Sequence, residues 1–185
     1  MPMGHTVAFP LLRTTDLDAI FSLANRILAL SVPDPRGGTE IWAEVSSRAE
    51  LRRLLEAVPE AEVGEGYKED AATSGDSPLP FGPGLLFMEL PDPERALNAA
   101  RAALGVHDRL EVYWDAFCWP EVPDLGLEWT WKYARLQVSL HHNGTDFGSP
   151  WTEDHTLFVH VGKEERAVWV AAQVGAEIIG EYTIC

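Results

Sequence analysis

The sequence is short of positive charge. Its 185 residues include 14 Lys and Arg against 29 Asp and Glu, a formal net charge of −15 with the histidines neutral. An acidic surface repels nucleic acid and anionic lipid, and no stretch of the chain carries a basic stripe. We therefore expect no nucleic-acid partner, and any charge-driven partner should be a basic protein.

Cysteine is scarce and long apolar runs are absent. Two cysteines, Cys118 and Cys185, are too few for a disulfide framework, which favours a reducing compartment. No apolar run approaches the roughly 20 residues that span a bilayer. Residues 1–12 lack the basic start and apolar stretch of a signal peptide. These absences predict a soluble cytoplasmic protein without membrane association; they leave the oligomeric state open.

The motifs of familiar active sites are also missing. No G-x-S-x-G occurs, and the glycines in residues 64–66 and 82–84 lack both the P-loop lysine and the G-x-G-x-x-G spacing. Cys118 alternates with apolar residues, where a thiol stays protonated and inert. We therefore expect no cofactor, and the sequence favours a protein that is not an enzyme.

What the sequence does contain is hydrophobic periodicity. Residues 17–28, 47–58 and 92–104 show the three-and-four spacing of an amphipathic helix. Thr15 with Asp18 and Ser47 with Glu50 resemble capping boxes at the first two helix starts. Eight stretches alternate or are wholly apolar, as strands are: residues 5–12, 39–45, 85–90, 109–119, 127–140, 155–161, 166–174 and 177–183.

The order of these elements predicts an α+β fold. We expect a mostly antiparallel β-sheet of six to eight strands with two or three helices packed on one face. Pro10 should end or bend the first strand, and a β-bulge near residues 133–134 would explain the change of apolar phase within 127–140.

The length suits a single domain over residues 1–185. Residues 59–84 lose all periodicity and are rich in Gly, Pro, Ser and acids. Such a stretch buries too little apolar surface to offset the entropy cost of ordering. We predict a mobile acidic insertion there, with a functional lid as the alternative.

One face of the segment 109–119 combines acids with aromatic rings. Glu111, Tyr113 and Asp115 alternate with apolar residues, and the same face continues to Trp119. Acids beside aromatic rings suit recognition of a cationic surface; the plain alternative is a face covered by other strands. The leading hypothesis is a non-enzymatic protein-binding domain, such as an immunity or inhibitor protein that neutralises a basic nuclease toxin. Its predicted contact residues are Glu111, Tyr113, Asp115, Trp119, Asp124 and Glu128.

A second group combines histidines with carboxylates between residues 141 and 160. Imidazole and carboxylate are ligands for zinc or non-haem iron. The alternative hypothesis is therefore a small-molecule-binding domain or a metal-dependent enzyme; its metal ligands would be drawn from His141, His142, Asp146 and His155. Adjacent His141 and His142 should point to opposite faces of a strand, so only one could join a site. A polar loop flanked by edge histidines explains the same pattern.

The sequence contains seven tryptophans, and some of them could be exposed on the surface. Most should lie in the core, because a pleated sheet accommodates large rings. The candidates for exposure are Trp119, Trp129 or Trp131, and Trp151.

Overall fold

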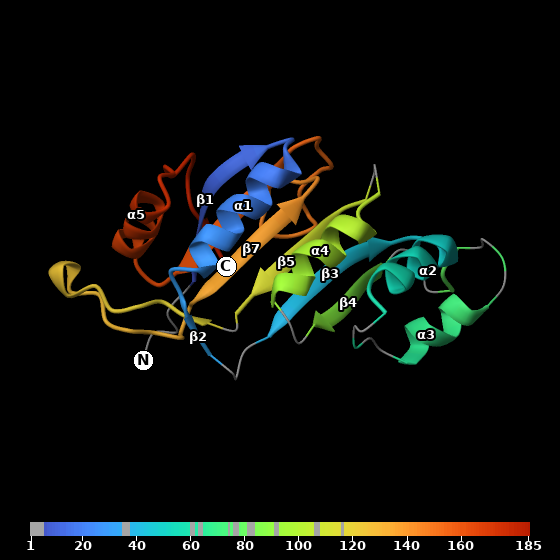
Figure 1. The fold of residues 1–185 in the computed structure, drawn as a ribbon. Coiled ribbons are helices and arrows are strands. Elements are labelled where there is room, and N and C mark those ends of the chain that lie inside the picture. The colour runs from blue at the N-terminus through green and yellow to red at the C-terminus, as the bar shows by residue number, and fades with distance from the viewer. Residues whose placement is uncertain are drawn as a thin grey trace.

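The computed structural model describes residues 6–34, 38–59, 62, 65–73, 75, 78–80, 84–90, 93–105, 108–115 and 117–185. A seven-stranded antiparallel sheet dominates it, accompanied by five α-helices (Figure 1). The α+β prediction is confirmed; the number of helices is five rather than two or three.

The main sheet has the order β4-β3-β5-β7-β8-β1-β9. Its strands are β1 (Val7–Thr14), β3 (Thr39–Val45), β4 (Gly84–Leu90), β5 (Leu110–Trp114), β7 (Arg135–Leu140), β8 (His155–Val161) and β9 (Thr183–Ile184). A separate pair joins β2 (Val32–Pro33) to β6 (Phe117–Cys118). Pro10 bends β1 as predicted, because the register with β8 shifts between Pro10 and Leu12.

The five helices are α1 (Leu17–Leu28), α2 (Arg48–Ala57), α3 (Glu65–Ala72), α4 (Pro93–Ala103) and α5 (Glu164–Gln173). Helix α1 buries its apolar stripe; Asp16, not Thr15, caps it by accepting hydrogen bonds from the backbone of Asp18 and Ala19. The predicted Ser47–Glu50 capping box of α2 is present. No helix in the described ranges is long and apolar enough to cross a membrane.

The prediction of a strand over 166–174 is wrong, because this stretch lies in and just after α5. Ala167, Val170, Ala171 and Val174 are buried at spacings of three, one and three residues, which is helical. Glu164 and Glu165 lie in the first turn of α5, where negative side chains stabilise the start of a helix. The predicted strand over 177–183 is also wrong: only Thr183 and Ile184 pair with β1.

Two other predicted strands are shorter than expected. In residues 127–140 only β7 is strand, and Tyr133 takes a left-handed conformation with φ of 65° where we expected a bulge. Residues 109–119 divide into β5 and β6, which belong to different sheets.

Part of the predicted insertion has regular structure. Helix α3 lies within residues 59–84 and packs against α2, so residues 65–72 are helical although the sequence there shows no periodicity. Arg52 of α2 donates to the carbonyl groups of Thr73 and Gly75. Mobility of the segment stays a prediction.

The sheet has two unlike faces. Helices α1 and α4 cover one face (Figure 1), over apolar side chains such as Ile41, Val112 and Val138. The alternate residues point away from these helices, and we call that side the polar face. Its members include Trp42, Glu111, Tyr113, Gln137, Ser139, Thr156 and His160.

Candidate functional site

The six residues predicted to contact a partner do not form one surface. Glu111 and Trp119 are buried, Tyr113 and Asp115 are half-buried, and Asp124 and Glu128 are exposed. The expectation that Trp119 is exposed is wrong: its indole Nε1 donates to the carbonyl oxygen of His160 at 3.1 Å, and its ring meets Phe117 edge-on.

Glu111 and Tyr113 share the polar face as the alternation predicted. The Tyr113 hydroxyl donates to Glu111 Oε2 at 2.6 Å and lies 3.4 Å from the carbonyl oxygen of Thr145. Burial raises the pKa of Glu111 to about 7, and the nearby charge of Asp146 adds to this. Burial and Glu111 together raise the pKa of Tyr113 above its ordinary value. Glu111 is therefore an interior carboxyl group that titrates near neutral pH.

His142 lies next to Glu111 and is fully buried. Its Nε2 lies 3.4 Å from Glu111 Oε1, longer than a normal hydrogen bond, and its ring stacks on Phe147. Burial lowers the pKa of His142 to about 4, with Arg109 contributing. Because Glu111 is only 3% exposed and His142 is 0% exposed, this pair is closed off from a substrate in solution.

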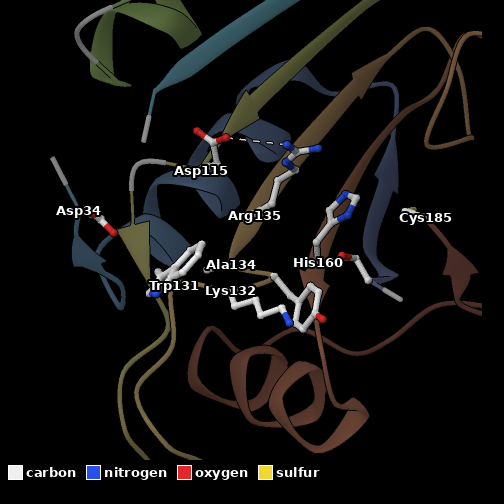
Figure 2. Close-up of a pocket in the computed structure, with 10 residues that line it drawn as sticks. Asp34, Asp115, Trp131, Lys132, Ala134, Arg135, His160 and Cys185 are labelled. Carbon is white, nitrogen blue, oxygen red and sulfur yellow. Dashed lines mark ion pairs between the residues drawn. The ribbon is translucent and has the colours of Figure 1, made fainter. Parts of the chain in front are cut away.

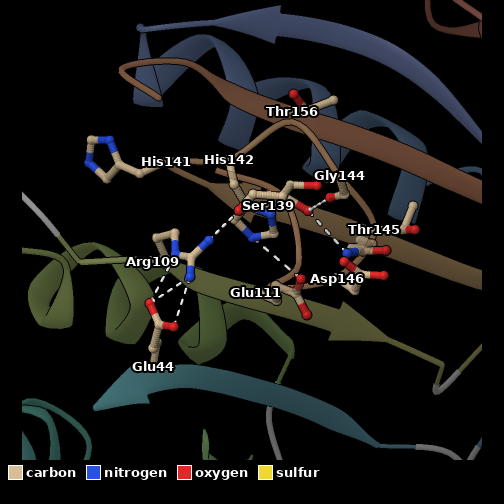
Figure 3. Close-up of polar contacts among 12 residues, drawn as sticks. Glu44, Arg109, Glu111, Ser139, His141, His142, Gly144, Thr145, Asp146 and Thr156 are labelled. Atoms are coloured by element: carbon tan, nitrogen blue, oxygen red, sulfur yellow. Dashed lines mark hydrogen bonds and ion pairs between the residues drawn. The ribbon is translucent and has the colours of Figure 1, made fainter. Parts of the chain in front are cut away.

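Arg109 secures the same loop from the other side. Its guanidinium binds both carboxylate oxygens of Glu44 at 2.7–2.9 Å (Figure 3). It also donates to the carbonyl oxygen of Ser149 and lies over the Phe147 ring. A bidentate pair of this kind fixes orientation as well as adding attraction.

The four residues of the metal hypothesis are spread over different surroundings. His141 has a φ of 61°, stacks on Trp151 and contacts the His155 ring edge-on. Its backbone N–H donates to His155 Nδ1, whereas Asp146 is exposed. Burial lowers the pKa of His155 to about 4. Among the residues that the structure describes, no three His, Cys, Asp or Glu side chains are grouped to hold a metal ion.

Hydrogen bonds cross the polar face in a buried row. His160 Nε2 lies 2.8 Å from Gln137 Oε1, Gln137 Nε2 donates to Ser139 Oγ, and Ser139 donates to the carbonyl oxygen of Gly144. Because an amide oxygen only accepts, His160 Nε2 carries the proton. Burial lowers the pKa of His160 to about 3, which keeps the ring neutral. The sequence pattern did not reveal this row, because it depends on pairing between strands.

A cavity of about 570 Å³ opens at the end of the polar face (Figure 2). Its walls carry Asp34 and Asp115 as well as Lys132 and Arg135, and Trp131 also lines it. Asp115 is already engaged: it accepts from the Gly38 N–H at 2.8 Å and lies 3.7 Å from Arg135. The wall of the cavity therefore carries both signs of charge.

Residues 119–131 form a hairpin that reaches away from the sheet, near α5 (Figure 1). Backbone hydrogen bonds join Trp119 to Thr130 and Val122 to Leu127, and a short 3-10 turn, Pro123–Leu125, forms the tip. We call this element the acidic hairpin, because Glu121, Asp124 and Glu128 are exposed on it and residues 117–131 contain no Lys or Arg.

Large apolar side chains are exposed beside these acids. Leu125 is 51% exposed, Trp129 50% and Trp131 56%. Exposure of Trp129, Trp131 and Trp151 agrees with prediction; Leu125 was missed, although its place between two predicted acids in a lysine-free stretch was a usable signal.

The acidic hairpin is held by a buried arginine. Arg166 of α5 is 4% exposed and donates to the carbonyl groups of Pro120 and Glu128, one on each arm of the hairpin. The two arms are therefore fixed to the body of the protein.

Comparison of this chain with protein-family models, with curated proteins and with solved structures finds no match.

Proposed function

We propose that this chain is a non-enzymatic binding protein whose acidic hairpin recognises a basic surface on another protein. The observation that carries the proposal is the composition of the hairpin: three half-exposed apolar side chains, two of them indole rings, beside three exposed carboxylates in a stretch without Lys or Arg. In its most specific form, the partner is a cationic nuclease toxin and this chain is its inhibitor.

The two kinds of side chain have different roles in such a complex. Tryptophans are enriched among the residues that supply most binding energy, because a large ring fills a pocket and excludes water. Carboxylates speed the encounter with a cationic partner and disfavour acidic competitors. In a nuclease they would occupy positions that bind substrate phosphates.

The anchored geometry supports the proposal. A loop that becomes ordered on binding loses affinity to the cost of ordering, whereas a rigid element does not. Arg166 and the Trp119–His160 hydrogen bond fix the base of the acidic hairpin in the unbound protein.

The test compares two variants with the same charge change. The hairpin variant E121Q/D124N/E128Q removes three carboxylates from the hairpin. The control E56Q/E69Q/E153Q removes three exposed carboxylates from elsewhere. Each protein is used at low salt to capture partners from its host, and any retained protein is then purified and titrated.

We expect a basic protein that binds wild type and the control alike, binds the hairpin variant at least tenfold more weakly, and protects residues 119–131 from hydrogen exchange. W129A/W131A should weaken binding at least as much. The proposal fails if no basic protein is retained, or if the retained protein binds the hairpin variant as tightly as the control.

A further inference from the structure

A groove lies between the base of the acidic hairpin and α5. The two elements are neighbours in the fold (Figure 1), and Arg166 joins them through its hydrogen bonds to the carbonyl groups of Pro120 and Glu128. The groove has a volume of about 380 Å³. Small-molecule sites commonly have volumes of roughly 300–1,000 Å³, so this groove has room for a ligand of modest size.

Positive charge gathers in the groove, although the chain as a whole is strongly acidic. The sequence contains three lysines, and two of them, Lys132 and Lys163, line the groove and are exposed. The third cation of the lining is Arg166, which is 4% exposed. Among the described lining residues, Glu128 alone is acidic, so three positive charges and one negative charge leave the lining with a net charge of +2.

The charge of Arg166 is buried without a carboxylate to balance it. Its guanidinium donates to two backbone carbonyl groups. None of the ion pairs within the described ranges involves Arg166, Lys132 or Lys163. Arginine keeps its proton in proteins, and a buried charge is costly unless it is paired. A bound anion would therefore provide the missing opposite charge.

Exposed aromatic surface lies beside these cations. Trp129 lines the groove and is 50% exposed, so part of its indole ring is open to a ligand. Tyr133 also lines the groove, and its ring packs so closely on Gly162 that a Cβ there would lie 2.8 Å from it. Lys132 Nζ lies 4.8 Å from the centroid of the Tyr133 ring. A flat ring on an anionic ligand would thus find an indole to stack on, with cations nearby.

We propose that this groove binds a small phosphomonoester that carries a flat ring, with the ring against Trp129 and the phosphate group bound by Lys132 and Lys163. A phosphomonoester carries a charge of about −1.5 to −2 at pH 7, which matches the charge of the lining. The inference does not depend on the proposed function, because its three cations lie outside the acidic hairpin.

The experiment titrates ¹⁵N-labelled protein with phenyl phosphate and follows the amide signals by NMR. Inorganic phosphate and benzyl alcohol test the two halves of this probe separately. We expect saturable one-to-one binding of phenyl phosphate, with the largest shifts at the amides of Trp129, Thr130, Gly162 and Lys163. Inorganic phosphate should bind at least about tenfold more weakly because it lacks a ring to stack. Benzyl alcohol, which lacks the charge, should show no saturable binding.

Variants of the cations test the location of the site. K132Q/K163Q should weaken the binding of phenyl phosphate at least about tenfold, because it removes two hydrogen-bond donors that carry charge. The matched control is K68Q/R95Q, which removes two exposed cations outside the groove lining and should bind like wild type.

Variants of the tryptophans test the role of the ring. W129A should bind phenyl phosphate no more tightly than inorganic phosphate. W151A removes another exposed indole, outside the groove lining, and should keep the preference of wild type for phenyl phosphate.

Glu128 separates this inference from the proposed function. E128Q removes the carboxylate of the lining and should bind phenyl phosphate more tightly than wild type, whereas the same change should weaken binding of a basic protein to the acidic hairpin. The proposal is overturned if phenyl phosphate shows no saturable binding, if K132Q/K163Q binds it like K68Q/R95Q, if W129A keeps the preference over inorganic phosphate, or if E128Q binds it more weakly than wild type.

Discussion

At the scale of single residues, Glu111 gives the clearest prediction. Its folded-state pKa of about 7 lies above its ordinary value of 4.5. Its contribution to stability is therefore fully present below pH 4.5 and is lost as the pH rises through 7. E111Q removes this titration but keeps an acceptor for the Tyr113 hydroxyl. Relative to E111Q, wild type should lose up to about 3 kcal/mol of unfolding free energy between pH 5 and pH 8.

Urea unfolding of both proteins at several pH values measures this difference. Titrating groups that do not contact Glu111, such as His155 and His160, are common to both proteins and cancel in the comparison. Parallel stability curves over this range would show that the carboxyl group of Glu111 ionises normally in the folded protein.

At the scale of elements, the sequence predicts the bounds of a strand or helix best where its buried residues follow one regular spacing. Strands 39–45 and 155–161 have the predicted bounds, because alternation in β3 and the β-branched and aromatic residues of β8 both fit strands. The sequence predicts a strand where α5 lies because its valines also suit strands. Packing against β1 and β8 favours the helix.

In the candidate site, too, some features could be predicted from the sequence and others could not. Alternation correctly placed Glu111 and Tyr113 on one face of β5. Alternation could not show that the loop containing Thr145, more than thirty residues later, covers that face. It also could not show that Trp119 donates a hydrogen bond to the backbone of His160. Exposed residues such as Asp124 and Glu128 were predictable because turn residues and acids mark a solvated tip.

The link between α5 and the acidic hairpin gives a prediction about an element. R166M keeps most of the buried stem but removes the hydrogen bonds to Pro120 and Glu128. A hydrogen bond from a charged group contributes about 1.5–3 kcal/mol. We therefore expect the amides of Trp119, Val122, Leu127 and Thr130 to exchange at least tenfold faster, with β3 unchanged. K163M removes one exposed charge next to α5 as the control, and equal exchange in the two variants would contradict the anchoring role.

At the scale of the whole molecule, the net charge of −15 predicts salt-dependent stability. Repulsion among like charges opposes the compact state, and salt screens it. The melting temperature should rise between 20 and 300 mM NaCl, by about 3 °C for each kcal/mol of repulsion relieved. The two triple variants used to test binding should both melt higher at low salt and show a smaller rise. A melting temperature that is constant or falls with salt would show that the surface charges are already balanced locally.

The pairing of β1 with β8 has a consequence for synthesis. Residues 7–14 leave the ribosome early, but their partners at 155–161 are made about 150 residues later. Strands β3, β4 and β5 can associate in the meantime as a three-stranded intermediate, while β1 waits unpaired. Pairing over such separations is slow and leaves strand edges open to aggregation. Nascent chains halted before residue 155 should therefore engage chaperones through β1, and release of β8 should end that association.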